Sequence, residues 1–214
     1  MVTEARRRRL SAEERRERIL EAALEAFAER GYRDASMAAI AMKAGITPAV
    51  IYDHFGSKAE LHLTLMETKA QNLLLAVGTA VAEAPDDLYA RMHAGVDAFF
   101  AFVEQQNFAW WILFRDPPGD PKLAKAHAEI QRNATLGIAA LLRESVPRNL
   151  LRRKNAERDL EMFAQLLRTA QNGLAAWWYD HREVPREALV DRVVEFCWLG
   201  LERVAAGERA GPGG

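Results

Sequence analysis

Residues 19–62 read ILEAALEAFAERGYRDASMAAIAMKAGITPAVIYDHFGSKAELH, and this stretch decides the fold. Its first part carries apolar residues at helical spacing, namely Leu20, Leu24 and Phe27. Gly31 suits the left-handed backbone conformation that ends a helix. We therefore predict a first helix over about residues 11–30. Ser11 and Glu14 are spaced to form a capping box at its start.

Two short helices are predicted after this one. Ser36 opens the first of them, which ends before Gly45, where the chain makes a tight turn. Thr47 is placed to cap the second, over residues 48–55, and a proline at its first position loses no helical hydrogen bond. Two short helices around such a turn form a helix-turn-helix, whose second helix enters the major groove of DNA. An ordinary helical hairpin is the alternative interpretation of the turn alone.

Residues 16–62 resemble the DNA-binding domain of the TetR family of transcriptional regulators. The shared features are a Gly-aromatic pair, a Ser that opens the second helix, and the motifs Ile-Ala, Ala-Gly, Tyr-x-His-Phe and Ser-Lys-x-Glu-Leu at the family's spacing. The resemblance implies a DNA-binding domain over residues 1–62 and a ligand-binding and dimerisation domain over residues 63–214. It also implies a regulator of transcription, most often a repressor.

The resemblance places the DNA contacts in and around the second short helix. Phosphate contacts are expected from Ser36, Tyr52, His54 and Lys58. Base contacts are expected from Thr47, Pro48, Ala49, Val50 and Asp53. A half-buried packing role is the alternative for His54. The short helix has no Arg or Lys for guanine and no Asn or Gln for adenine. We therefore expect DNA shape and a basic N-terminal arm to add specificity. The arm consists of Arg6, Arg7, Arg8 and Arg9. The alternative is that these residues form a solvated tail that does not contact DNA.

The whole chain has the composition of a folded globular protein. It has 214 residues, half of them apolar, and a net charge of −1, which excludes disordered, collagen-like and disulfide-scaffold classes. Pro and Gly separate about nine predicted helices, and no strand pattern is present, so we expect an all-α fold. The single cysteine and the absence of a long apolar run favour a cytoplasmic protein without a membrane partner.

Aromatic residues are concentrated between residues 99 and 114. Apolar pockets between helices commonly hold small molecules, so we expect a site for a hydrophobic or aromatic effector here. The predicted lining consists of Phe99, Phe102, Val103, Phe108, Trp111, Phe114, Gln131 and Gln171. A filled core is the alternative for these aromatic residues, and a DNA-binding regulator without an effector is the corresponding alternative function.

Two long helices are predicted at the end of the chain, over about residues 154–181 and 185–207. Each carries an apolar stripe at helical spacing, and in the family such a pair forms a four-helix bundle with its symmetry mate. We therefore expect a homodimer that binds double-stranded DNA at a palindromic operator. The predicted interface consists of Phe163, Leu167, Leu174, Trp178, Val193, Cys197 and Leu201. The alternative is that both stripes belong to an intramolecular core.

A helical enzyme acting on a hydrophobic substrate is the alternative from a different functional class. The chain has no Gly-x-Ser-x-Gly motif, phosphate-binding loop or nucleotide-binding fingerprint. His93 and Asp97 stand four residues apart, but two ligands are too few for a metal site. We therefore expect no enzyme activity, no catalytic residues, no metal and no cofactor.

Overall fold

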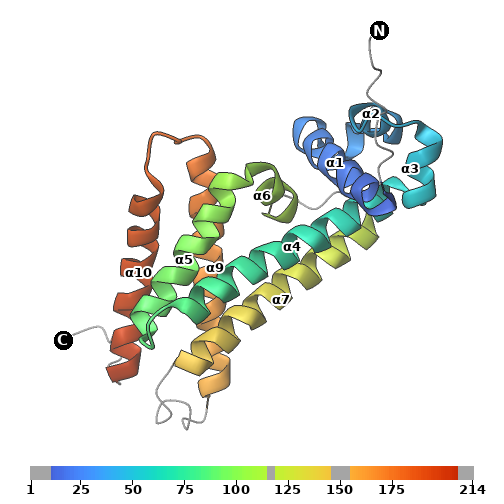
Figure 1. The fold of residues 1–214 in the computed structure, drawn as a ribbon. Helices are drawn as coiled ribbons and strands as arrows, with labels where there is room; N and C mark the ends of the chain where they lie inside the picture. Colours follow the sequence, from blue (N-terminus) through green and yellow to red (C-terminus); the bar gives the residue numbers. More distant parts are fainter. Residues whose placement is uncertain (1–10, 115–118, 146–154, 207–214) are drawn as a thin grey trace.

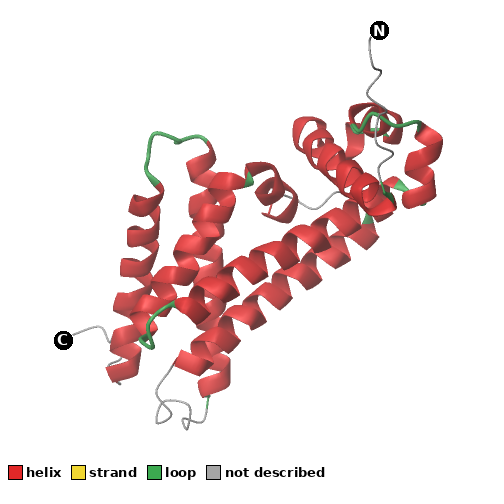
Figure 2. Cartoon of the chain, viewed as in Figure 1, coloured by secondary structure: helices red, strands yellow, loops and turns green. Residues whose placement is uncertain are grey.

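The fold consists of helices joined by short loops (Figures 1 and 2). The computed structural model describes residues 11–114, 119–145 and 155–206, without the side chains of residues 107, 145 and 200–206. Within these residues the chain forms nine helices and no strand, which confirms the predicted all-α fold. The helices are α1 (Ala12–Asp34), α2 (Met37–Lys43), α3 (Pro48–His54), α4 (Lys58–Glu83), α5 (Leu88–Gln105), α6 (Asn107–Phe114), α7 (Pro121–Ser145), α9 (Ala156–Tyr179) and α10 (Arg186–Ala206).

Local sequence signals set the ends of the first helices. The Ser11 hydroxyl accepts a hydrogen bond from the Glu14 amide at 3.1 Å, and the Glu14 carboxylate accepts one from the Ser11 amide at 2.7 Å, so the predicted capping box is confirmed. Gly31 has a φ of 74°, which ends the regular part of α1 and directs residues 32–34 toward α2. Gly45, with a φ of 68°, begins the turn between α2 and α3.

The helix-turn-helix is held by a shared core rather than by its own helical propensity. Helices α2 and α3 have seven residues each, which is too short for an isolated helix to persist in water. Their apolar faces are buried with those of α1 and α4 in one cluster, whose fully buried members include Ile19, Ile40, Ile51, Phe55, Leu61 and Leu65. Tertiary packing therefore fixes the position of α3.

Helix α4 connects this unit to the rest of the molecule. It continues without interruption through the predicted domain boundary at residue 62. The helix-turn-helix lies at one end of α4 and α7, while α5, α9 and α10 pack together toward the other end (Figure 1). No described helix has both the length and the hydropathy that a membrane span requires.

Helix α6 forms a second connection between the two parts. Ile112 is buried in the helix-turn-helix core, and Leu24 of α1 packs in return against the cluster that Ala109 and Leu113 of α6 form with Phe102 of α5. The α1–α6 contact is therefore apolar and closely packed. A displacement of α6 would disturb the core on which α1 rests, because packed interiors deform little.

Candidate DNA-binding and ligand-binding sites

Helix α3 presents most of the predicted base-reading residues to solvent. Ile51 and the adjoining Phe55 face the core, with at most 1% of their surface exposed. The residues on the opposite face are exposed, namely Thr47, Pro48, Ala49, Tyr52 and Asp53, while Val50 and His54 are half-buried. This surface has the size and position of a recognition helix, and its individual DNA contacts stay predictions.

The two predicted caps of α2 and α3 behave differently. The Ser36 hydroxyl accepts a hydrogen bond from the Ala39 amide at 3.1 Å, so it caps α2 as predicted. Thr47 occupies the capping position of α3, but its side chain makes no capping hydrogen bond, which corrects the prediction. The Thr47 hydroxyl is therefore available to a base or a phosphate.

Lys58 has a structural role that the sequence did not reveal. Its ammonium group donates to the backbone carbonyls of Tyr32 at 2.8 Å, Arg33 at 3.1 Å and Ala35 at 2.9 Å. It also lies 4.7 Å from the centre of the Tyr32 ring. A lysine ammonium has three donors, so this arrangement uses all of them. The structure thus assigns Lys58 to the junction between α1 and α4 and leaves it no free donor for phosphate.

We expect the exchange Lys58→Met to lower the free energy of unfolding by about 1–3 kcal/mol, because three backbone carbonyls, two of them in partly buried hydrogen bonds, lose their charged donor. The slope of log K for DNA binding against log salt should stay unchanged, since a lost phosphate contact reduces it by about 1. Urea unfolding and DNA titrations at several salt concentrations measure the two effects. A reduced slope with unchanged stability would instead establish the phosphate contact.

Arg18 is a candidate phosphate contact that the sequence reading missed. One of its terminal guanidinium nitrogens lies 3.2 Å from the position that a Cβ on Gly45 would take, so the guanidinium lies at the turn between α2 and α3.

Lys43, by contrast, is paired with Glu25 at 2.9 Å and Glu29 at 2.8 Å. The Lys43 ammonium lowers the pKa of the Glu29 carboxyl, and the pair reduces the charge that Lys43 offers to DNA. The predicted arm of four arginines lies outside the described residues.

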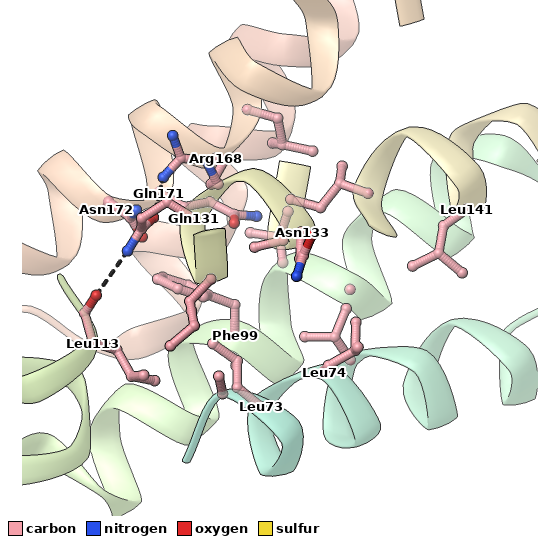
Figure 3. A pocket seen from close by; sticks show the side chains of 18 of the residues that line it. Leu73, Leu74, Phe99, Leu113, Gln131, Asn133, Leu141, Arg168, Gln171 and Asn172 are labelled. Carbon is pink, nitrogen blue, oxygen red and sulfur yellow. Dashed lines mark hydrogen bonds between the residues drawn. The ribbon is translucent and has the colours of Figure 1, made fainter. Parts of the chain in front are cut away.

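A cavity of about 350 Å³ lies between α4, α5, α7 and α9 (Figure 3). Its wall is mainly aliphatic, with leucine and valine side chains from α4 and further apolar residues from α5 and α7. Along α4 the lining extends from Glu67 to Val81, a length of about 21 Å at 1.5 Å per residue. This volume lies within the range of small-molecule sites, and the shape is elongated.

Half of the predicted ligand-binding residues line this cavity. Phe99, Phe114, Gln131 and Gln171 belong to the lining. The remaining four do not, because residues that are adjacent on α5 or α6 point to different sides of the helix. Phe102 and Val103 are buried in the apolar core, Phe108 is 39% exposed, and Trp111 lines a second hollow between α1, α4 and α6. The aromatic segment is therefore divided among core, surface and two hollows.

The predicted dimer residues are mostly part of the chain's own core. Four of them are at most 6% exposed and belong to one buried apolar cluster, namely Leu167, Trp178, Val193 and Cys197. Phe163 and Leu174 are half-buried and pack against this cluster. The side chain of Leu201 lies outside those that the structure describes. Among the described side chains, the large apolar residues that α9 and α10 expose are different ones, namely Met162, Leu166, Trp177, Tyr179, Phe196 and Leu199. This finding corrects the predicted interface: the side of each helix that is exposed in the single chain is not the side that carries the predicted residues.

His93 and Asp97 have separate partners in the structure. The His93 ring lies 3.7 Å from the Asp191 carboxylate, and the Asp97 carboxylate lies 3.1 Å from the Arg186 guanidinium. Across the described residues, no group of three His, Cys, Asp or Glu side chains has an arrangement that could hold a metal ion.

Two family descriptions match this chain. Residues 19–65 match "Bacterial regulatory proteins, tetR family", and residues 88–200 match "Tetracyclin repressor-like, C-terminal domain". The chain is 31% identical over 205 residues to the HTH-type transcriptional activator FasR of Mycolicibacterium smegmatis, covering 92% of this chain and 87% of that protein. The HTH-type transcriptional regulator SrpR of Pseudomonas putida is 41% identical over 71 residues, which is 33% of each chain.

Solved structures share the fold over most of the length. A TetR-like transcriptional regulator from Rhodococcus sp. RHA1 superposes with a TM-score of 0.74 at 24% identity, over 91% of this chain and 99% of that one. The regulator FadR from Bacillus subtilis, solved in complex with stearoyl-CoA, gives a TM-score of 0.74 at 17% identity, over 85% and 96%.

Proposed function

This chain belongs to the TetR family of DNA-binding transcriptional regulators, and from that premise we propose a homodimer whose affinity for DNA is changed by a ligand with a long hydrocarbon chain. The ligand occupies the cavity between α4, α5, α7 and α9. The helix-turn-helix of each subunit binds one half-site of a palindromic operator.

The observation that carries this proposal is the position of α6 between the two sites. Ile112 is buried in the helix-turn-helix core, and the next residues, Leu113 and Phe114, line the cavity. A ligand that moves Leu113 therefore acts on the helix that also supports α1. Helix α4 gives a second route, because one continuous helix begins at the recognition unit and lines the cavity further along. The ligand changes DNA binding to the extent that it prefers one arrangement of these helices.

The shape and lining of the cavity support a ligand with a single extended chain. A lining of about 21 Å with mainly aliphatic walls suits a hydrocarbon chain better than a compact polar molecule. The FadR structure from Bacillus subtilis, which has the same fold, was solved with stearoyl-CoA. We take a long-chain acyl group as the ligand class on these two grounds.

The exposed apolar face of α9 and α10 supports the dimer. Phe196 is 74% exposed and Leu199 is 64% exposed, and Leu166 on the neighbouring helix is 67% exposed. Phe196 and Leu199 stand three residues apart and so share one face of α10, and exposed apolar patches of this kind mark interaction surfaces. A second copy of the same face would cover them in a symmetric four-helix bundle.

The direction of regulation depends on where the operator lies relative to the promoter. The family resemblance predicted a repressor, whereas the Mycolicibacterium relative is named an activator. We therefore propose that the ligand alters operator affinity, and that the promoter context converts this change into repression or activation.

The two alternative functions are less well supported. A regulator without an effector predicts a filled core near Phe99 and Phe114, but these residues line a cavity. The relatives FasR and SrpR, which are named as regulators of transcription, do not support the hypothesis that the chain is a helical enzyme.

Selection from randomised duplex DNA, followed by titration of the selected site, tests the proposal. We expect enrichment of an inverted repeat, and we expect stearoyl-CoA or stearate to change its affinity at least about tenfold, a typical allosteric coupling. Enrichment with no effect of either acyl compound would refute the ligand class but keep the DNA-binding function.

A bulky residue inside the cavity should abolish the ligand response. We expect Ala134→Phe to reduce acyl-ligand binding at least about tenfold, because the ring occupies the space of the chain. Operator affinity without ligand should stay within about threefold of the original. The matched control is Ala140→Phe, at an exposed position of the same helix. Ligand binding measured by calorimetry and DNA binding measured by fluorescence anisotropy decide the outcome. An unchanged response in Ala134→Phe would place the ligand elsewhere.

A further inference from the structure

The two ends of the cavity differ in chemistry. The end near the α4–α5 turn is lined by apolar side chains such as Val81, Leu141 and Leu142. The other end contains Arg168, Gln171 and Asn172 of α9 together with Gln131 of α7 (Figure 3). The acidic residues of the lining, Glu67 of α4 and Glu129 of α7, also lie toward this end. An apolar site with polar groups at one end orients a ligand that is itself polar at one end.

Arg168 is a cation that the described chain does not neutralise. Its guanidinium donates to the Thr135 hydroxyl at 2.9 Å, to the Gln165 amide oxygen at 3.1 Å and to the Gln131 amide oxygen, all of which are uncharged. Within the part of the chain that the structure describes, no Asp or Glu oxygen lies within 4.0 Å of it. Burial lowers the pKa of Arg168, and no acid opposes that effect.

Arg91, the second arginine in the cavity wall, differs from Arg168 because it has an acidic partner. The Arg91 guanidinium, toward the apolar end, lies 3.1 Å from the Asp86 carboxylate and is neutralised by it. An unneutralised, half-buried cation is costly unless an anion approaches it. Arg168 is therefore a cation without an acidic partner of its own, while the two carboxylates that line the same cavity, Glu67 and Glu129, form no ion pair with it.

A neighbouring amide also has unused hydrogen-bonding capacity. Gln171 is only 6% exposed and belongs to the lining of the cavity. The Asn172 amide oxygen is buried and has no partner among the described residues. This oxygen is an acceptor, so it needs a donor such as a water molecule and cannot pair with a carboxylate. Arg168, Gln171 and Asn172 are spaced i, i+3 and i+4, so they share one face of α9. Buried polar groups without partners are rare and commonly mark a site for a ligand or water.

We infer that the cavity binds a single-chain amphiphile whose carboxylate pairs with Arg168 and whose hydrocarbon chain extends toward Leu141 and Leu142. This inference rests on the proposed function, in which the cavity holds an acyl chain. The three existing bonds leave one N–H free on each terminal nitrogen of Arg168, which matches the two oxygens of a carboxylate. The Gln171 amide N–H lies on the same face of α9 as a further donor.

Arg168 is then the residue that determines specificity for the head group. A free carboxylate gains a charged pair that an alcohol of the same chain length lacks. The difference corresponds to an affinity ratio of about ten to a hundred, as expected for hydrogen bonds to charged groups. A coenzyme A thioester, which has no carboxylate at this position, also lacks the pair.

The test compares stearate, stearyl alcohol and stearoyl-CoA on the full-length protein, by displacement of a fluorescent fatty-acid probe. We expect stearate to bind at least about tenfold more tightly than either of the other two. In Arg168→Met this preference should vanish, while the affinity for stearyl alcohol stays within about threefold, which also shows that the variant is folded. The matched control is Arg158→Met, at an exposed position of the same helix, and it should keep the preference.

The outcomes separate this inference from the proposed function. Equal affinity for the acid and the alcohol, or tighter binding of stearoyl-CoA than of stearate, would overturn the carboxylate assignment and keep the acyl-chain site. An equal loss of both ligands in Arg168→Met would assign Arg168 a structural role only and also overturn the inference. Failure of all three probes to bind would overturn both.

Discussion

The exchange Phe196→Arg is expected to convert the protein into a monomer and to weaken operator binding about a hundredfold or more. Among the described side chains of α9 and α10, Phe196 is the most exposed large apolar residue, at 74%. In the proposed bundle it is buried against the second subunit, so the arginine would place a charge in an apolar interface. Two linked helix-turn-helix units gain about 10²–10⁴ in affinity over one, and a monomer loses this gain.

Sedimentation velocity and anisotropy titrations with full-site and half-site DNA measure this effect. The variant should bind the full site no better than the half-site. The matched control is Leu75→Arg, because Leu75 is equally apolar and 71% exposed but lies on α4. A Phe196→Arg protein that remains a dimer with full affinity would show that the interface uses another surface.

The second large effect is a loss of stability in mild acid that originates from His62. This residue of α4 is 4% exposed and packs edge-on against the rings of Phe27 and Tyr32, with centroid distances of 4.8 Å and 5.0 Å. Its Nδ1 atom is buried and has no hydrogen-bond partner among the described residues. Burial, reinforced by the positive charges of His127 and Lys58, lowers the pKa of His62 from 6.5 to about 4.

The direction of the pH effect follows from this lowered pKa. Above pH 6.5 the imidazole is neutral in the folded and the unfolded protein, and its contribution to stability is complete. As the pH falls from 6.5 toward 4, the unfolded chain takes up a proton that the folded chain does not, so the unfolded state gains stability. A shift of this size corresponds to a loss of about 3 kcal/mol by pH 4.

Urea unfolding between pH 7 and pH 4, at a fixed protomer concentration, measures the loss. The exchange His62→Phe keeps a ring against Phe27 and Tyr32 but cannot be protonated, so the variant should lose about 3 kcal/mol less than the original protein over this range. The control His54→Phe makes the same exchange at a half-buried histidine of α3, so it separates the effect of losing His62 from that of adding a phenyl ring elsewhere. Parallel stability curves for the original protein and His62→Phe would show that His62 titrates normally.

The sequence by itself determined the helices and the recognition unit. Capping residues act within one turn, so Ser11 and Glu14 predicted the start of α1, and the glycines before α2 and α3 adopt the positive φ angles that their turns require. The exposed face of α3 followed from the burial of Ile51 and Phe55 at i and i+4. These signals are local, and local chemistry suffices to read them.

Only the tertiary structure decided how those helix faces are used. Lys58 carries the pattern of a phosphate contact, yet three carbonyls at the end of α1 take its donors. The apolar stripes of α9 and α10 were predicted to face a second subunit, but Leu167 and Val193 are buried within the chain. The polar end of the cavity depends on Arg168 meeting Gln131 from another helix. Helical periodicity shows which residues share a face, whereas the neighbour of that face is set by contacts between residues far apart in the chain.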